Sequence, residues 1–152
     1  MTREGAVKIK LAPQEDFFQI HELLIENGLP TVGVDSGAGN YYIVGGQEIR
    51  GVIGVERYGM SVMLRSLAVK PQFRNGGVAG ELIDYALRAI KGTGVTDIYL
   101  LTNTAERYLA RFGFAKIERG EIPNHILATS ALGDACPSSS TCMHLMLHRY
   151  RV

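Results

Sequence analysis

A basic, glycine-rich turn stands between an apolar run and an amphipathic helix in the stretch LAVKPQFRNGGVAGEL, residues 67–82. The first N–H groups of a helix have no partner within the helix and carry a partial positive charge. Because glycine lets other groups approach the backbone closely, a turn such as Arg74 to Gly77 can bring a phosphate to these N–H groups. Arg74 adds a permanently charged, bidentate donor. The stretch is therefore either a plain tight turn or a cradle for a phosphate-bearing cofactor, although it matches neither common nucleotide fingerprint.

The spacing of apolar residues predicts an α/β fold with a mixed sheet of about six to seven strands and helices on both faces. Strands are expected at 7–11, 41–44, 51–58, 61–69, 95–101, 114–117 and 143–149. Helices are expected between Pro13 and Asn27, from Gly77 to Lys91, at about 105–112 and at 124–130. The stretch 29–39 is rich in glycine, proline and serine, so we expect a mobile loop there. Two strands that flank the helix from Gly77 should be parallel and joined by a right-handed crossover.

Composition limits the classes of function that the chain can have. With 152 residues, 46% of them hydrophobic and 20% charged, the sequence predicts a single globular domain over residues 1–152. A formal net charge of +1 gives no general field that would attract nucleic acid or an anionic membrane. No stretch approaches the roughly 20 apolar residues of a membrane span, and the first residues do not resemble a signal peptide. Two cysteines argue against a disulfide scaffold, so a reducing cytoplasm is expected.

The turn and a second motif further along the chain resemble the GCN5-related N-acetyltransferase (GNAT) family. The first family signature is [Q/R]-x-x-G-x-[G/A] after a strand that ends in L-x-V-x-P, and it is matched by Leu67, Val69, Pro71, Arg74, Gly77 and Ala79. The second is an alanine-containing helix that ends in G-F, here Asn103-Thr104-Ala105 through Gly113-Phe114. The order of expected elements agrees from about Val7 to Arg149. The resemblance favours the cofactor cradle and implies the GNAT fold with a splayed pair of parallel strands.

The resemblance implies acetyl-coenzyme A as the cofactor. Its pyrophosphate would lie on the turn 74–80, and its pantetheine arm would pair with the first splayed strand like an added strand. The residues that this assigns to cofactor binding are Leu67, Ala68, Val69, Arg74, Asn75, Gly76, Gly77, Val78, Ala79, Gly80, Asn103, Ala105 and Tyr108.

Acetyl transfer to an amine needs a neutral amine, a polarised thioester carbonyl and a proton for the leaving thiol. A backbone N–H at Leu67 is the candidate for stabilising the oxyanion. Family members often carry a glutamate at about the place of Arg65, so Glu56 on the preceding strand becomes the candidate base. The family tyrosine that serves as acid would fall at Leu109. Tyr108 lies one residue earlier, and either Tyr108 or water could supply the proton.

Glu56 and Arg65 are expected on one face of a hairpin. If Tyr58 lies opposite Ser61, Glu56 lies opposite Met63 and Arg65 is its diagonal neighbour. In one interpretation Glu56 is the base, directly or through water, and both residues contact a substrate whose carboxylate Arg65 binds. In the other interpretation the two residues form a cross-strand ion pair.

The segment from Cys136 to Cys142 reads C-P-S-S-S-T-C. C-x₅-C is not a zinc spacing, so no metal site is expected, and the cysteines can simply flank a turn. His144 and His148 are expected on one face of the last strand. With the stretches 63–69 and 99–102, the segment resembles a subgroup of these acetyltransferases encoded in arsenic-resistance operons. That resemblance implies a small, amino-acid-like acceptor and would allow contact between the thiols and trivalent arsenic.

Three functions are consistent with these patterns. The first is an enzyme that acetylates the primary amine of a small, anionic molecule by direct attack in a ternary complex, and Arg65, Arg57 and the loop 29–39 would help select that molecule. The second is a coenzyme A-binding sensor without catalysis, because the expected acid and base are not in their usual places. The third is an acetyltransferase that acts on protein amines. Dimers are common in the family, so a homodimer is a further expectation.

Overall fold

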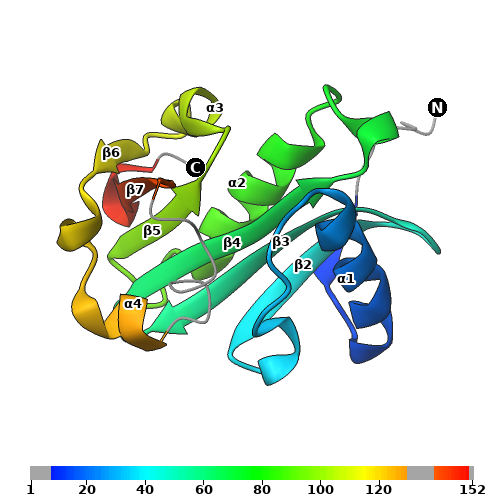
Figure 1. The fold of residues 1–152 in the computed structure, drawn as a ribbon, viewed down its shortest axis with the longest axis horizontal. Helices are drawn as coiled ribbons and strands as arrows, with labels where there is room; N and C mark the ends of the chain where they lie inside the picture. Colours follow the sequence, from blue (N-terminus) through cyan, green and yellow to red (C-terminus); the bar gives the residue numbers. More distant parts are fainter. Residues whose placement is uncertain (1–7, 130–138, 151–152) are drawn as a thin grey trace.

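One mixed sheet forms the centre of the molecule (Figure 1). The computed structural model describes residues 8–129 and 139–150. The strands in these residues are β1 (Ile9–Leu11), β2 (Gly39–Gly45), β3 (Ile49–Tyr58), β4 (Ser61–Val69), β5 (Asp97–Thr102), β6 (Ala115–Ile117) and β7 (Thr141–Met146). Their order in the sheet is β1-β2-β3-β4-β5-β7-β6, and β4 and β5 are parallel whereas the other neighbours are antiparallel. The predicted mixed sheet is confirmed.

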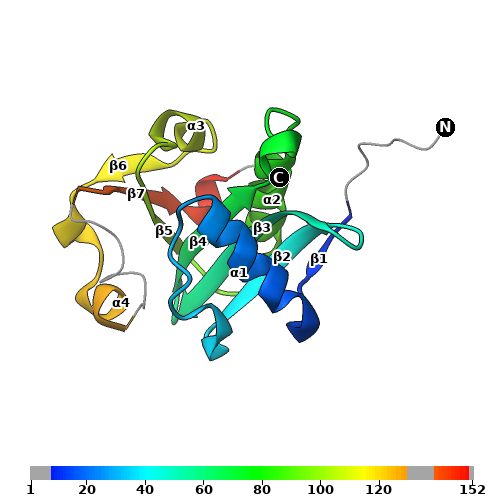
Figure 2. The same cartoon turned by 45° about the vertical axis from the view of Figure 1, so that its right-hand side comes forward.

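Helices cover both faces of this sheet, as predicted. The helices are α1 (Phe17–Glu26), α2 (Val78–Ile90), α3 (Glu106–Ala110) and α4 (Asn124–Thr129). Apolar residues of α1 pack with Val52, and those of α2 pack with the adjacent Ile53. Successive strand residues point to opposite faces, so α1 and α2 lie on opposite sides of the sheet. Figures 1 and 2 show α1 in front of the sheet, and Figure 1 shows α4 beside the end of the sheet where β3 ends and β4 begins.

Short 3₁₀ turns connect several of these elements. They lie at Gln14–Asp16, Val34–Ser36, Pro71–Phe73, Arg119–Glu121 and Leu147–Arg149. The 3₁₀ turn at 71–73 begins with a proline, whose fixed φ suits the first position of a helical turn. It ends the course of β4 and leads the chain into the basic, glycine-rich turn before α2.

The hairpin between β3 and β4 has the register that the sequence predicts. Tyr58 pairs with Ser61, and Glu56 pairs with Met63. Arg65 pairs with a glycine two residues before Glu56, so the two charged side chains are diagonal neighbours on one face. This face is the one that α1 covers.

The parallel pair separates part of the way along β4. Paired residues run from Ser61 with Asp97 to Leu64 with Leu100, and no further pairs follow. Ser66 has a positive φ of 59°, and the register between β3 and β4 shifts at the same place. A bulge of this kind bends the strand and increases its twist. The far half of β4 therefore presents backbone groups that β5 does not pair, which confirms the splayed pair.

The last strand differs from its prediction. It was expected over 143–149 but comprises Thr141–Met146, and the chain continues as a 3₁₀ turn at Leu147–Arg149. The leucine that starts this turn remains buried, so the apolar alternation of a strand continues where the strand has ended. His148 consequently lies in the turn and does not share a strand face with His144.

The stretch 29–39 is partly packed rather than wholly a loop. It contains the 3₁₀ turn at Val34–Ser36, and Val34 is buried with apolar residues of α1. Cys142 is a buried free thiol on β7, whereas Cys136 lies outside the described residues. In the part of the chain that the structure describes, no helix is both long and apolar enough to cross a membrane.

Candidate active site

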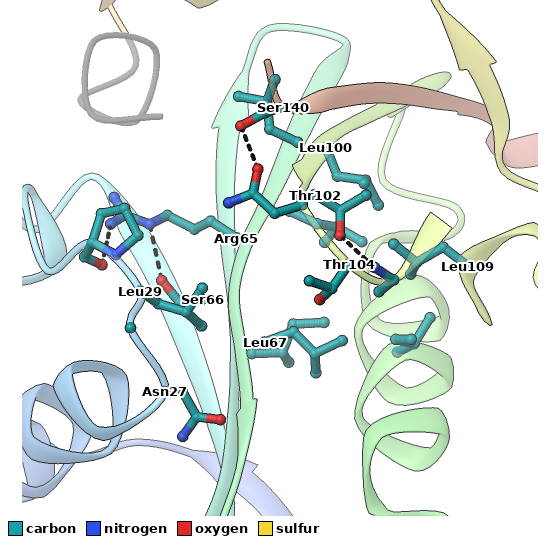
Figure 3. Close-up of a pocket in the computed structure, with 18 residues that line it drawn as sticks. Asn27, Leu29, Arg65, Ser66, Leu67, Leu100, Thr102, Thr104, Leu109 and Ser140 are labelled. Carbon is teal, nitrogen blue, oxygen red and sulfur yellow. Dashed lines mark hydrogen bonds between the residues drawn. The ribbon is translucent and has the colours of Figure 1, made fainter. Parts of the chain in front are cut away.

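A cavity of about 620 Å³ lies where β4 and β5 separate (Figure 3). Three segments form its walls: the end of α1 with the loop that follows, the bulged half of β4, and the end of β5 with the turn into α3. Figure 3 shows Leu67 from β4, and Thr102 and Thr104 from the end of β5, around this space. The lining residues are Asn27, Gly28, Leu29, Pro30, Ile53, Leu64, Arg65, Ser66, Leu67, Ile83, Leu100, Leu101, Thr102, Asn103, Thr104, Ala105, Leu109 and Ser140.

Glu56 and Arg65 form a buried ion pair beside this cavity. Arg65 Nη1 donates to Glu56 Oε2 at 3.0 Å, and the side chains are 0% and 2% exposed. The hydroxyl of Tyr58 donates to Glu56 Oε1 at 2.8 Å, so both carboxylate oxygens accept hydrogen bonds. Arg65 lines the cavity and Glu56 does not. The predicted ion pair is confirmed, whereas the roles of Glu56 as base and Arg65 as substrate ligand stay predictions.

Arg65 also connects β4 to the loop after α1. Its Nε donates to Ser66 Oγ at 3.0 Å, and its Nη2 donates to the carbonyl of Pro30 at 3.4 Å. Figure 3 shows Arg65 and Ser66 on the side of β4 that faces this loop. The bond to Pro30 is the longest of the three bonds that Arg65 makes to these partners and to Glu56, so it is the weakest by geometry.

The aromatic ring of Tyr41 packs beneath this polar cluster. A Cβ on Gly54 would lie 2.5 Å from Tyr41 Cε2 and 3.1 Å from the Cγ of Arg65, so glycine is required there for the close approach of the ring. Burial raises the pKa of the Tyr41 hydroxyl, and the nearby charge of Arg65 partly opposes that effect. Tyr41 is thus a buried, neutral support for the strand that carries Arg65.

The basic turn lies at the N-terminus of α2. Asn75 and Gly77 have positive φ values of 66° and 86°, and no atom beyond the two adjoining residues lies within 4 Å of the position of a Cβ on Gly77. The guanidinium of Arg74 is folded back, with Nε donating to the Val69 carbonyl at 3.1 Å and Nη2 donating to Asn27 Oδ1 at 2.6 Å. The turn is exposed to solvent and open to a ligand at the helix N-terminus, where a phosphate fits the free N–H groups.

The end of β5 forms the opposite wall of the cavity. Thr102 Oγ1 accepts a hydrogen bond from the N–H of Ala105 at 3.0 Å, which fixes the turn into α3. The hydroxyl of Ser140, the residue just before β7, donates a hydrogen bond to Asn103 Oδ1 at a distance of 2.8 Å. The structure therefore brings Leu67, Asn103 and Ala105 to one cavity, as expected for the two walls of a cofactor site.

Tyr108 lies away from this cavity. A Cβ on Gly80 would be 2.9 Å from the Tyr108 hydroxyl, so the hydroxyl rests against the first turn of α2. The ring packs edge-on against Phe112 at 5.5 Å between centroids. Its neighbour Leu109 is buried and lines the cavity instead. The roles of Tyr108 as catalytic acid and as cofactor ligand stay predictions, and its hydroxyl contacts the first turn of α2 at Gly80.

Sequence reasoning missed two sets of lining residues. Ser66 and Ser140 carry hydroxyl groups into the cavity wall, and Asn27 and Gly28 close its other side. Leu29 and Pro30, from the loop predicted to help select the acceptor, also line the cavity, whereas Asn27 and Gly28 were predicted only as the end of a helix. Ser140 was within a segment noted for its cysteines, and its place depends on how β7 pairs with β5.

The model of the acetyltransferase (GNAT) domain family matches residues 37–116. The chain belongs to this family. An uncharacterized N-acetyltransferase from Chlorobaculum tepidum is 30% identical over 79 residues, which are 52% of this chain and 48% of that protein. The match thus spans about half the length of this curated relative. The family match confirms the resemblance that the two motifs indicate, and it makes the chain a GNAT acetyltransferase domain.

Solved structures agree with the GNAT fold over almost the whole chain. N-acetylglutamate synthase from Neisseria gonorrhoeae, complexed with coenzyme A and N-acetyl-glutamate, has a TM-score of 0.79 at 20% identity. That likeness covers 97% of this chain and 37% of the synthase. Rv2747 from Mycobacterium tuberculosis, in complex with coenzyme A and a second ligand, has a TM-score of 0.76 at 16% identity. That likeness covers 91% of this chain and 98% of Rv2747. At these identities the likeness shows the fold, and the predicted GNAT fold is confirmed.

Proposed function

We propose that this GNAT domain is an acetyl-CoA-dependent N-acetyltransferase that acts on the primary amine of a small, amino-acid-like molecule. The observation that carries the proposal is a cavity between splayed parallel strands that adjoins a glycine-rich turn at a helix N-terminus. Bound acetyl-CoA would supply an activated acetyl thioester. Amine and thioester would meet in one ternary complex, since one cavity reaches both the β4 edge and the loop after α1.

The chain has suitable partners for each part of this cofactor. The turn from Arg74 to Gly80 offers backbone N–H groups and the dipole of α2 to a pyrophosphate. The backbone of β4 beyond Leu64 is not paired by β5, so it can bond the amides of an extended arm in the manner of an added strand. Leu67 to Val69 supply that edge.

Charge at the cavity favours an acceptor that carries an anionic group next to its amine. Among the described lining residues, Arg65 is the only ionisable side chain. Its side chain is fully buried against Glu56, so its charge would meet an acceptor only where the loop after α1 moves aside. A substrate carboxylate can replace the weak bond from Arg65 Nη2 to Pro30 if the loop after α1 shifts. The glutamate derivative named for the gonococcal synthase is an acceptor product of this chemical class.

The catalytic groups follow from the same geometry. The β4 backbone at Leu67 stabilises the negative charge that develops on the carbonyl oxygen. Glu56 is the candidate base, and because its carboxylate is buried and does not line the cavity, the amine proton would reach it only through a water that enters beside Arg65 when the loop after α1 shifts. Water supplies the proton for the leaving thiol, and Tyr108 is the alternative donor.

A free-thiol release assay tests the proposal. Acetyl-CoA is offered with anionic α-amino acids, including phosphorus- and arsenic-bearing ones, with cationic polyamines, and with peptides that have free N-termini or lysines. We expect turnover on the anionic amino acids and little on the polyamines. Tight binding of acetyl-CoA without turnover on any acceptor would identify a sensor, and turnover on peptides alone would identify a protein acetyltransferase.

A further inference from the structure

The segment between the two cysteines contributes a hydroxyl group to the cavity wall. Ser140 is 8% exposed, lines the cavity, and donates its hydrogen bond to Asn103 Oδ1 at 2.8 Å. A buried hydroxyl with a single side-chain partner in a ligand cavity fixes the orientation of that partner. Ser140 therefore has a structural relation to the cavity that is independent of the two cysteines.

The register of the sheet explains how the two residues meet. In the antiparallel pairing of β5 with β7, Thr102 lies opposite Thr141 as the last pair. One step beyond this pair, Asn103 comes to lie opposite Ser140. The bond from the N–H of Ala105 to Thr102 Oγ1 holds the backbone of the turn, so Asn103 is fixed through both its backbone and its amide.

We propose that Ser140 is a positioning residue that orients the Asn103 amide toward the acyl-CoA arm. Because Oδ1 of Asn103 faces Ser140, its Nδ2 group points in a different direction and keeps two N–H donors. No hydrogen bond from Nδ2 to another described residue is present, and Asn103 lines the cavity. A carbonyl oxygen of the coenzyme's amide-rich arm is the partner that these donors would take. This inference rests on the proposed use of acetyl-CoA.

The experiment is isothermal titration calorimetry of coenzyme A with the whole chain. Ser140→Ala should weaken binding by about three- to tenfold, the range for one lost hydrogen bond. Ser139→Ala is the matched control, because it removes a hydroxyl from the neighbouring, exposed residue and should leave the Kd unchanged. Ser140→Thr keeps the hydroxyl and should recover most of the affinity.

A double-mutant cycle shows whether Ser140 acts through Asn103. We expect Asn103→Ala to weaken binding, and Ser140→Ala to add no further loss in that background. In turnover assays Ser140→Ala should raise the KM for acetyl-CoA, while kcat and the KM for the acceptor should stay within about twofold of the wild-type values.

Two results would overturn the inference: a Ser140→Ala Kd equal to that of Ser139→Ala, or a loss in Ser140→Ala that adds in full to that of Asn103→Ala. Failure of the proposed function looks different, since wild-type protein would then bind no coenzyme A or would bind it without turnover. Melting curves of the free variants show whether any loss of affinity reflects unfolding. A loss confined to the acceptor KM would also contradict the assignment to the acyl-CoA arm.

Discussion

Removing the charge of Glu56 should show how much this residue contributes to the stability of the fold and how much to catalysis. We expect Glu56→Gln to lower the melting temperature by about 6–20 °C. Breaking a buried ion pair by removing one partner costs about 3–5 kcal/mol. In a domain of this size each kcal/mol of stability shifts the melting temperature by about 2–4 °C.

The local contacts explain why the expected loss is large. Glutamine keeps an oxygen that can accept from Tyr58, but its amide nitrogen would face Arg65 Nη1 where Oε2 now accepts at 3.0 Å. Two donors would then oppose each other in a site that is closed to water, and the charge of Arg65 would lack its partner. Replacing both charges, in Glu56→Gln with Arg65→Met, should recover much of the loss because no uncompensated charge stays buried.

Thermal unfolding of these two variants, a control variant and the wild type, together with steady-state kinetics, provides the measurement. Glu48→Gln is the control, because it breaks an exposed pair with Lys70 and should cost at most about 1 kcal/mol. If Glu56 is also the base, kcat of Glu56→Gln falls at least about a hundredfold at a temperature where the variant is folded. A Glu56→Gln protein that melts together with the Glu48→Gln control would refute the reasoning.

Three further outcomes follow from single contacts. Gly54→Ala should destabilise the fold by about 1–3 kcal/mol in thermal unfolding, since the new methyl group would overlap the ring of Tyr41. Tyr108→Phe should leave kcat within about twofold, and a tenfold fall would make this hydroxyl the catalytic acid. Burial and a hydrogen bond to Asp84 raise the pKa of Tyr150 to about 12, so the stability it contributes is present below about pH 10 and is lost between pH 10 and 12. Tyr150→Phe should therefore show a smaller fall in melting temperature over that window than wild type.

Features that depend on nearby residues could be predicted from the sequence. The β3–β4 register follows from the tight turn after Tyr58, and the turn before α2 follows from its glycines and the apolar repeat behind it. The bulge could not be predicted, because a serine with positive φ at Ser66 has no local signature. The contact between Asn103 and Ser140 requires the pairing of β5 with β7, which no short pattern encodes.

The Glu56–Arg65 pair also bears on what the acceptor site can select. At about the place where related enzymes often carry a glutamate, this chain has Arg65, and the carboxylate stands one strand away. Arg65 is the residue of the pair that lines the cavity, but its side chain is fully buried, so its charge reaches an acceptor only if the loop that holds Pro30 moves aside. An acceptor with several positive charges would meet Arg65 without a lining carboxylate among the described residues, which costs binding energy. An anion beside the amine would gain a charge-assisted bond instead.

Arg65→Gln, made together with Glu56→Gln so that no buried charge is left unpaired, should therefore raise the KM for anionic acceptors more than for neutral ones. An equal effect on both classes would show that Arg65 supports the fold and does not choose the substrate.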